Sequence, residues 1–136
     1  LSAVPERAAR TALPRPAGML EVEGLTVAAP GEAGAILRSV SFRVGPGQAL
    51  GVIGSSGSGK STLARALTGV WRPLGGQVRL DGATLDQYDP EVLGRQIGYL
   101  PQRVTLFDGT IAENIARLDP APDSARVIAA ARQADA

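Results

Sequence analysis

A glycine-rich segment that contains the chain's only lysine carries the clearest chemistry in the sequence. Residues 54–61 match the pattern G-x-x-x-x-G-K-[ST] in full. Glycines let a backbone wrap closely around an anion, and successive N–H groups at the positive end of a helix dipole attract phosphate. The pattern therefore predicts a loop that binds a polyphosphate. Its predicted ligand-binding residues are Gly54, Ser55, Ser56, Gly57, Ser58, Gly59, Lys60, Ser61 and Thr62.

Three side chains of this motif have separate expected roles. Lys60 supplies a mobile charge for the β- and γ-phosphates, and the Ser61 hydroxyl is an oxygen ligand of the kind that Mg²⁺ prefers. Thr62 is expected to reach the α-phosphate through its amide or its hydroxyl. The alternative interpretation is a flexible Gly/Ser loop with a chance lysine. The motif's context, an apolar run before it and a helical pattern after it, argues against that alternative.

The elements around the motif are predicted from the spacing of apolar residues. Alternation over residues 19–27 and 36–44 predicts two half-buried strands, the first bent at Gly24. The continuous apolar run 49–53 predicts a strand that is covered on both faces. A helix is expected over Lys60–Leu67, with Gly69 as its C-terminal cap. A third alternating strand is expected over residues 76–80.

The second half of the chain contains clear turn and capping signals. Asp81-Gly82 reads as a turn, so we assign Asp81 a structural role. Asp89-Pro90 predicts the start of a short helix to about Arg95, followed by a strand over residues 96–100. Thr110 and Glu113 form a capping box that predicts a helix to about Leu118. A last helix is expected from Asp123 or Ser124 to Ala136 without a stop signal. Trp71, Tyr88 and Tyr99 are expected to be packing or surface residues.

The composition excludes several classes of function. The 136 residues include no cysteine and no histidine, which excludes disulfides, thiolate metal sites and histidine general bases. The formal net charge of +1 gives no reason to expect a nucleic-acid partner. No apolar run approaches the roughly 18 residues of a membrane span, and no signal-peptide pattern opens the chain. We therefore expect a soluble chain whose membrane partner is a separate segment or chain.

Five further segments carry a resemblance to a known family: residues 40–53, 67–73, 75–82, 97–102 and 106–115. Together they resemble the nucleotide-binding domain of ABC transporters. The resemblance covers Met19 to Ala136, and residues 85–89 and 114–117 are most similar to the ATPase-permeases of bacterial type I protein secretion. The family implies an α/β fold, a P-loop NTPase core with an ABC-type antiparallel β layer, truncated before the end of the helical subdomain.

The resemblance also implies domains, ligands and partners. Residues 1–18 are expected to be a linker, 19–107 the ATP-binding core with P-loop and Q-loop, and 108–136 the start of a helical subdomain. Gln102 corresponds to the Q-loop glutamine, expected to contact Mg²⁺ and the attacking water. ATP and Mg²⁺ are the implied ligands. The implied partners are the transmembrane domain of an exporter and a second nucleotide-binding domain, a homodimer in the parent, at the cytoplasmic face of the bacterial inner membrane.

The sequence departs from the family in ways that bear on activity. No aromatic residue lies near Ala28–Gly31, where the family places a ring that stacks on adenine. The signature motif, the Walker B strand with its catalytic glutamate and the switch histidine do not occur. The chain by itself is therefore expected to hydrolyse ATP negligibly. The alternative function is a non-catalytic Mg·ATP-binding module. A GTPase with the guanine motif N-K-x-D is excluded because Lys60 is the only lysine.

Overall fold

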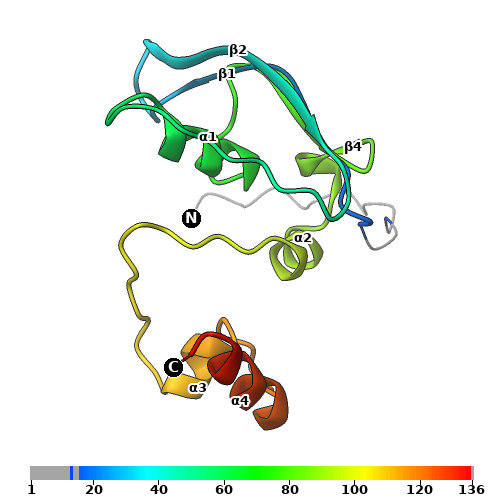
Figure 1. The fold of residues 1–136 in the computed structure, drawn as a ribbon, viewed down its shortest axis with the longest axis vertical. Helices are drawn as coiled ribbons and strands as arrows, with labels where there is room; N and C mark the ends of the chain where they lie inside the picture. Colours follow the sequence, from blue (N-terminus) through cyan, green and yellow to red (C-terminus); the bar gives the residue numbers. More distant parts are fainter. Residues whose placement is uncertain (1–12, 14–15, 136) are drawn as a thin grey trace, which may run out of the picture. The chain divides into compact units, whose positions relative to one another are not determined.

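The structure is a computed structural model that describes residues 13 and 16–135 and divides into two compact units, Leu1–Tyr99 and Leu100–Ala136. The first unit contains the β-sheet and the glycine-rich loop, and the second contains two short helices (Figure 1). The predicted linker, residues 1–18, lies largely outside the described residues. Among the residues described, no helix combines the length and the apolar character needed to cross a bilayer.

Four antiparallel strands form the sheet of the first unit, in the order β2-β1-β3-β4. Strand β1 has apolar residues directed at one face: Val22 lies opposite Phe42 on one side and Val78 on the other. The intervening Glu21 lies opposite Arg43, whose Nε is 3.2 Å from the Glu21 carboxylate. The three predicted alternating strands are thus confirmed. The strands are β1 (Leu20–Ala28), β2 (Ala35–Val44), β3 (Gly75–Leu80) and β4 (Ala83–Thr84).

Strand β1 is irregular at Gly24, as the sequence predicts. Its register shifts between Val22 and Leu25 against β2, and between Glu23 and Thr26 against β3. Gly24 has φ 57°, and its N–H donates to Ser41 Oγ at 2.8 Å. Across the ladder, Gly76 has φ 73° and approaches so closely that an added Cβ would lie 2.3 Å from the Gly24 carbonyl oxygen. A glycine is therefore required at position 76 by both conformation and space.

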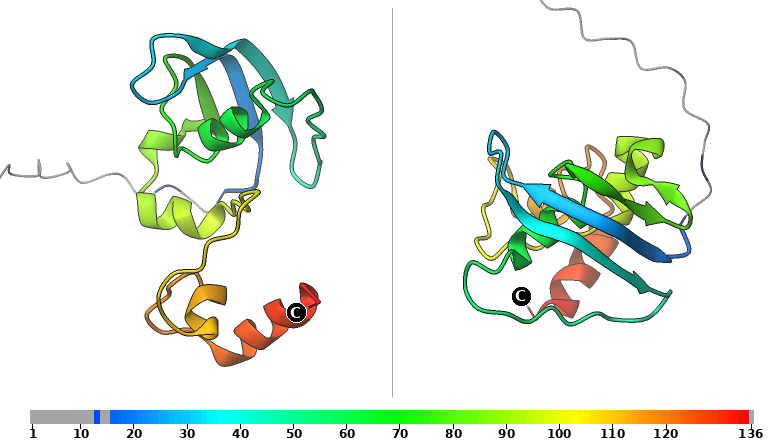
Figure 2. Two further views of the ribbon diagram at one scale, coloured as in Figure 1. Left: turned by 90° about the vertical axis from the view of Figure 1, so that its left-hand side faces the viewer. Right: turned by 90° about the horizontal axis from the view of Figure 1, so that it is seen from above.

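Helix α1 (Lys60–Leu67) packs against the apolar face of the sheet and completes the core of this unit (Figures 1 and 2). Gly69 has φ 75°, in agreement with its predicted role as C-terminal cap. Trp71 packs against the same core, and the Arg65 guanidinium lies 4.9 Å from the centre of the Trp71 ring. The buried core residues are Val22, Leu25, Val27, Leu63, Ala66 and Val78.

Two predicted strands are absent from the structure. The run 49–53 has no strand conformation, and its side chains are open to solvent, with Ile53 96% exposed. A strand covered on both faces needs hydrogen-bonded neighbours, and no strand pair within residues 13 and 16–135 includes this run. Residues 96–100 are also not a strand. Gln96 is the last residue of α2 (Pro90–Gln96), residues 97–100 have neither helix nor strand conformation, and Leu100 is 83% exposed.

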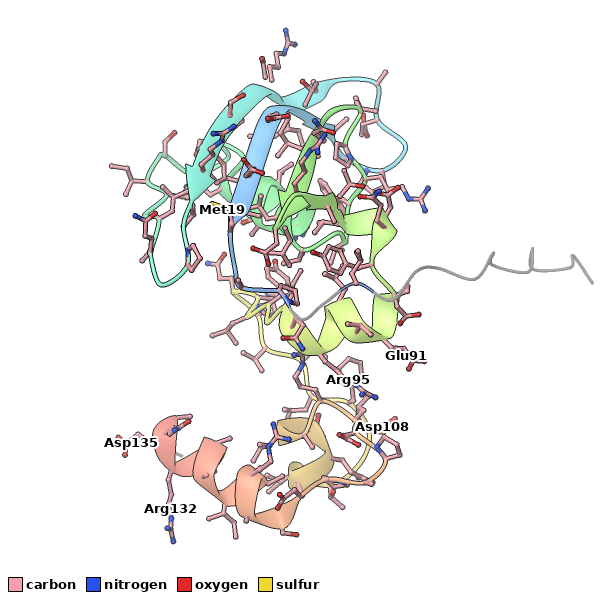
Figure 3. All side chains as sticks on the ribbon, turned by 90° about the vertical axis from the view of Figure 1, so that its right-hand side faces the viewer. Met19, Glu91, Arg95, Asp108, Arg132 and Asp135 are labelled. Carbon is pink, nitrogen blue, oxygen red and sulfur yellow. The ribbon has the colours of Figure 1, made fainter. Side chains whose placement is uncertain are left out.

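The turn after β3 has the structural role predicted for it. Asp81 and Gly82 have φ 50° and 82° and connect β3 to β4. The Asp81 carboxylate accepts hydrogen bonds from the amides of Ala17, Gly18 and Met19, and the Met19 bond measures 2.9 Å. These amides, that of Met19 foremost, lower the pKa of Asp81 below 3.8. Met19, the residue before β1 (Figure 3), is thereby attached to the β3–β4 turn.

The short 3-10 helix η1 (Leu85–Gln87) and helix α2 follow β4 and carry the first unit's other capping signals. Tyr88 lies between them and is buried, and its hydroxyl donates to the Leu80 carbonyl at 2.6 Å. Asp89 caps α2 as predicted, accepting from the Glu91 amide at 2.8 Å. Glu91 and Arg95 project from α2 to solvent (Figure 3).

The second unit contains helices α3 (Ile111–Ile115) and α4 (Ser124–Gln133). The predicted capping box is confirmed: the Glu113 amide donates to Thr110 Oγ1, and the Thr110 amide donates to the Glu113 carboxylate at 2.7 Å. Helix α3 ends before Leu118 because Arg117 and Leu118 adopt left-handed φ values. Asp123 caps α4, which ends at Gln133, whereas the sequence pattern predicted that the helix continues. Figure 3 labels Arg132 within the helix and Asp135 after it.

Candidate functional site

Glycine conformations shape the loop that precedes α1. Gly57 and Gly59 have φ 81° and 92°, which residues with side chains rarely adopt. The Ser58 amide donates to the Ser55 carbonyl at 3.3 Å and closes a turn. An added Cβ on Gly54 would lie 2.6 Å from Ser58 Oγ, so the two ends of the loop approach each other closely. The loop therefore has the compact form that the motif requires to surround an anion.

Gly59 joins the loop to the start of α1. It is the N-cap residue, it is buried, and no side chain among the described residues caps the first turn. An added Cβ on Gly59 would lie 2.7 Å from Leu37 Cδ2 and 3.2 Å from Ile36 Cγ2. The first amides of a helix are unsatisfied donors at the positive end of its dipole. This helix start can thus bind an anion, and only glycine fits where the loop meets β2.

The Lys60 ammonium group lies among the oxygens of the loop. Its Nζ donates to the carbonyls of Gly54 at 2.8 Å and Ser55 at 2.7 Å, and lies 3.5 Å from Ser58 Oγ. The side chain thus turns back from the helix start to the beginning of the loop. This arrangement holds a positive charge at the beginning of the loop, and the same motif ends in the uncapped first turn of α1.

Ser61 and Thr62 follow Lys60 in the first turn of α1 and differ in exposure. Ser61 is exposed, so its hydroxyl can reach a metal ion beside the loop. Thr62 is 6% exposed, which favours its backbone amide over its hydroxyl as the ligand-binding group. The residues present therefore fit a polyphosphate with an oxygen-coordinated cation: amides, one ammonium group and one hydroxyl.

Gln102 lies in a different part of the structure from these residues. It is exposed, has no helix or strand conformation, and belongs to the second unit, whereas residues 54–62 belong to the first. Its predicted contact with Mg²⁺ and water stays a prediction. Two residues beside the loop, Ile36 and Leu37, were not singled out from the sequence. Only the packing of β2 against the start of α1 brings them there, and the sequence carries no local signal for that contact.

Comparison with known proteins identifies the family. The model of the family "ABC transporter" matches residues 37–136. The chain is 50% identical over 134 residues to the type I secretion system ATP-binding protein PrsD of Rhizobium meliloti, covering 98% of this chain and 23% of that protein. It is 45% identical over 107 residues to an ATP-dependent lipid A-core flippase of Xylella fastidiosa, covering 79% of this chain and 18% of the flippase.

The fold gives the same result. A solved structure of a bacterial Atm1-family ABC exporter with ATP bound superposes with a TM-score of 0.78 at 31% identity, covering 95% of this chain and 22% of that one. The chain thus spans less than a quarter of the length of these relatives. The predicted fold class, α/β with the antiparallel β layer of an ABC exporter nucleotide-binding domain, is confirmed. The chain belongs to the ABC transporter family.

Proposed function

We propose that this chain is the ATP-binding part of an ABC exporter ATPase and that residues 54–62 bind Mg·ATP. The observation that carries the proposal is the position of the Lys60 ammonium group, 2.8 Å from the Gly54 carbonyl oxygen in the loop that leads into the uncapped start of α1. Relatives named as ATP-binding and ATP-dependent proteins support ATP as the ligand.

Each residue of the site has a defined task in this proposal. The amides of the loop and of the first turn hold the phosphate oxygens. Lys60 exchanges its carbonyl partners for oxygens of the β- and γ-phosphates, and the Ser61 hydroxyl binds Mg²⁺. When bound, the metal ion neutralises phosphate charge. Gln102 is the proposed further ligand of the metal and orients the attacking water.

The proposed parent protein couples ATP hydrolysis to export across the bacterial inner membrane. Its proposed partners are a transmembrane domain and a second nucleotide-binding domain, and this chain acts at the cytoplasmic face. Type I protein secretion is the proposed transport class, supported by 50% identity to PrsD and by 39% identity to the cyclolysin secretion/processing protein CyaB of Bordetella pertussis. Because the chain is also 45% identical to a lipid A-core flippase, lipid export is the alternative transport class that must be tested.

Calorimetric titration of the 136-residue chain with Mg·ATP tests the binding proposal. Loss of one hydrogen-bonded charge is worth about 1.5–3 kcal/mol, so Lys60→Ala should weaken binding about 10- to 150-fold. Arg43→Ala is the matched control, because it also removes one positive charge but lies on β2 in an ion pair with Glu21. Equal affinities of the two variants, or no binding by a chain whose Trp71 fluorescence shows it folded, would contradict the proposal.

Two further measurements separate the finer alternatives. A steady-state ATPase assay of the proposed parent protein distinguishes an exporter ATPase, which turns over ATP, from a non-catalytic Mg·ATP-binding module, which does not. The sequence contains no signature motif, Walker B glutamate or switch histidine, so the chain alone should show no turnover above the Lys60→Ala background. Deleting the encoding gene should remove particular proteins from the culture medium and leave lipid A in the outer membrane. Loss of lipid A with an unchanged secreted set would overturn the secretion assignment.

A further inference from the structure

Gly59 belongs both to the P-loop and to the hydrogen-bond ladder of α1. It ends the glycine-rich loop, and its carbonyl accepts the first bond of the helix from the Leu63 amide at 2.8 Å. Further along α1, Leu63 and Ala66 are buried in the core that the helix shares with the sheet. The uncapped amides of the first turn follow Gly59 directly, so a shift of Gly59 also shifts these amides.

Leu37 of β2 covers the face of Gly59 where other residues carry a side chain. A Cβ built on Gly59 would lie 2.7 Å from Leu37 Cδ2 and 3.5 Å from Leu37 Cγ. Leu37 is half-buried, packs against the core and lies opposite Val27 in the β1–β2 ladder. Ile36 also approaches Gly59, but Ile36 is 43% exposed and can turn toward solvent. Leu37 is therefore the constrained contact between the sheet and the end of the P-loop.

Amides bind phosphate oxygens well only when they are held in place, because a hydrogen bond weakens steeply as its angle departs from linear. Resting on the function proposed above, we infer that Leu37 is a positioning residue of the phosphate site. It holds Gly59, and through Gly59 the first amides of α1, where they meet the phosphate oxygens. Without the Leu37 side chain, α1 remains attached to the core through Leu63 and Ala66, but the end of the P-loop loses its contact with β2.

Calorimetric titration with magnesium tripolyphosphate tests this role, because this ligand supplies the phosphates without a nucleoside. Leu37→Ala should weaken binding about 10-fold, the loss expected when one hydrogen bond to a charged group is misaligned. Leu67→Ala is the matched control, since it makes the same change in another half-buried leucine of the same core, at the opposite end of α1. Leu67→Ala should bind tripolyphosphate within about twofold of the wild-type chain. Leu37→Met keeps the side-chain volume and should retain the affinity.

A double-mutant cycle with Gly59→Ala tests whether Leu37 acts through Gly59. In the wild-type chain, the added methyl group meets Leu37 Cδ2 and the residue must also adopt φ 92°, so Gly59→Ala should weaken tripolyphosphate binding by both effects. In Leu37→Ala the closest contact is gone and the conformational cost remains. Gly59→Ala should therefore weaken binding at least about fivefold less in Leu37→Ala than in the wild-type chain.

The outcomes separate this inference from the proposed function. If the folded wild-type chain binds neither Mg·ATP nor magnesium tripolyphosphate, the proposed function fails and the inference fails with it. If tripolyphosphate binds and Leu37→Ala and Leu67→Ala lose affinity equally, Leu37 supports only the core, so the inference fails and the function stands. Equal effects of Gly59→Ala in both backgrounds would also overturn the inference. If Trp71 fluorescence shows that Leu37→Ala is unfolded, Leu37→Val and Leu67→Val replace the pair, with the same outcomes decisive.

Discussion

Replacing Gly76 by alanine is expected to destabilise the first unit strongly, for two reasons that can be separated. Gly76 has φ 73°, a left-handed value. An added Cβ would also lie 2.3 Å from the Gly24 carbonyl oxygen and 2.4 Å from that of Glu23. Both contacts are with backbone atoms of β1, so relief requires the two strands to separate at the Gly24 irregularity.

The two contributions to the loss of stability add. A left-handed conformation costs a residue with a side chain about 1–2 kcal/mol. Forcing atoms into a filled space costs about 1–3 kcal/mol more. Gly82→Ala provides the matched control, because Gly82 has a similar φ of 82° but no atom within 4 Å of its added Cβ. Gly82→Ala should therefore lose about 1–2 kcal/mol, and Gly76→Ala about 2–5 kcal/mol.

Urea unfolding followed by Trp71 fluorescence measures this difference. Trp71 is the only tryptophan in the sequence and packs against the core of the first unit, so its signal reports on that unit. The free energies of unfolding of the two variants should differ by at least about 1 kcal/mol, with unchanged m-values. Equal losses in both variants would show that conformation alone matters, and that the close approach of Gly76 to β1 does not limit stability.

Three further perturbations test contacts elsewhere. Tyr88→Phe leaves the Leu80 carbonyl without its donor and should cost about 1–3 kcal/mol in urea unfolding at pH 7. Burial raises the pKa of Tyr88. The contribution of Tyr88 to the free energy of unfolding is therefore full below about pH 10 and is lost as pH rises through the folded-state pKa. Urea unfolding of Tyr88→Phe at alkaline pH should lack this loss. Backbone amides lower the pKa of Asp81. The contribution of Asp81 to the free energy of unfolding is therefore full above about pH 3.8 and is lost as pH falls through the lower folded-state pKa. In Asp81→Asn, urea unfolding should show a smaller loss of stability with falling pH. Thr110→Val removes the acceptor of the Glu113 amide, whose hydrogen exchange measured by NMR should accelerate, whereas unchanged protection would rule out the capping role.

Local signals explain which parts of the fold could be predicted. The alternation of apolar residues in β1 and β2 indicates which side chains face the core. Asp89 and Thr110 cap helices through hydrogen bonds to residues no more than three positions away. The run 49–53 shows the limit of such signals. A continuous apolar segment indicates burial but does not identify the strand that must lie beside it. Among the described residues, no strand pairs with residues 49–53.

The candidate site, like the fold, could be predicted only in part from local signals in the sequence. The motif predicts the loop, the helix after it and the residue types that bind phosphate. It does not predict that Lys60 bonds to the carbonyls of Gly54 and Ser55, or that Ile36 lies beside Gly59. Both contacts depend on where tertiary packing places the loop. These contacts could therefore be found only from the structure.

The order of strands in the sheet has a consequence for how the site forms during folding. The β1–β2 ladder joins neighbouring segments, whereas the β1–β3 ladder joins segments separated by residues 29–74, which include β2, the P-loop and α1. Closing a longer loop loses more chain entropy and slows folding. The hairpin can therefore form early, but α1 packs on a face that Val78 of β3 helps to build. The helix start at the P-loop becomes fixed only when the distant ladder closes, so a mutation that delays β3 delays the formation of the phosphate site as well.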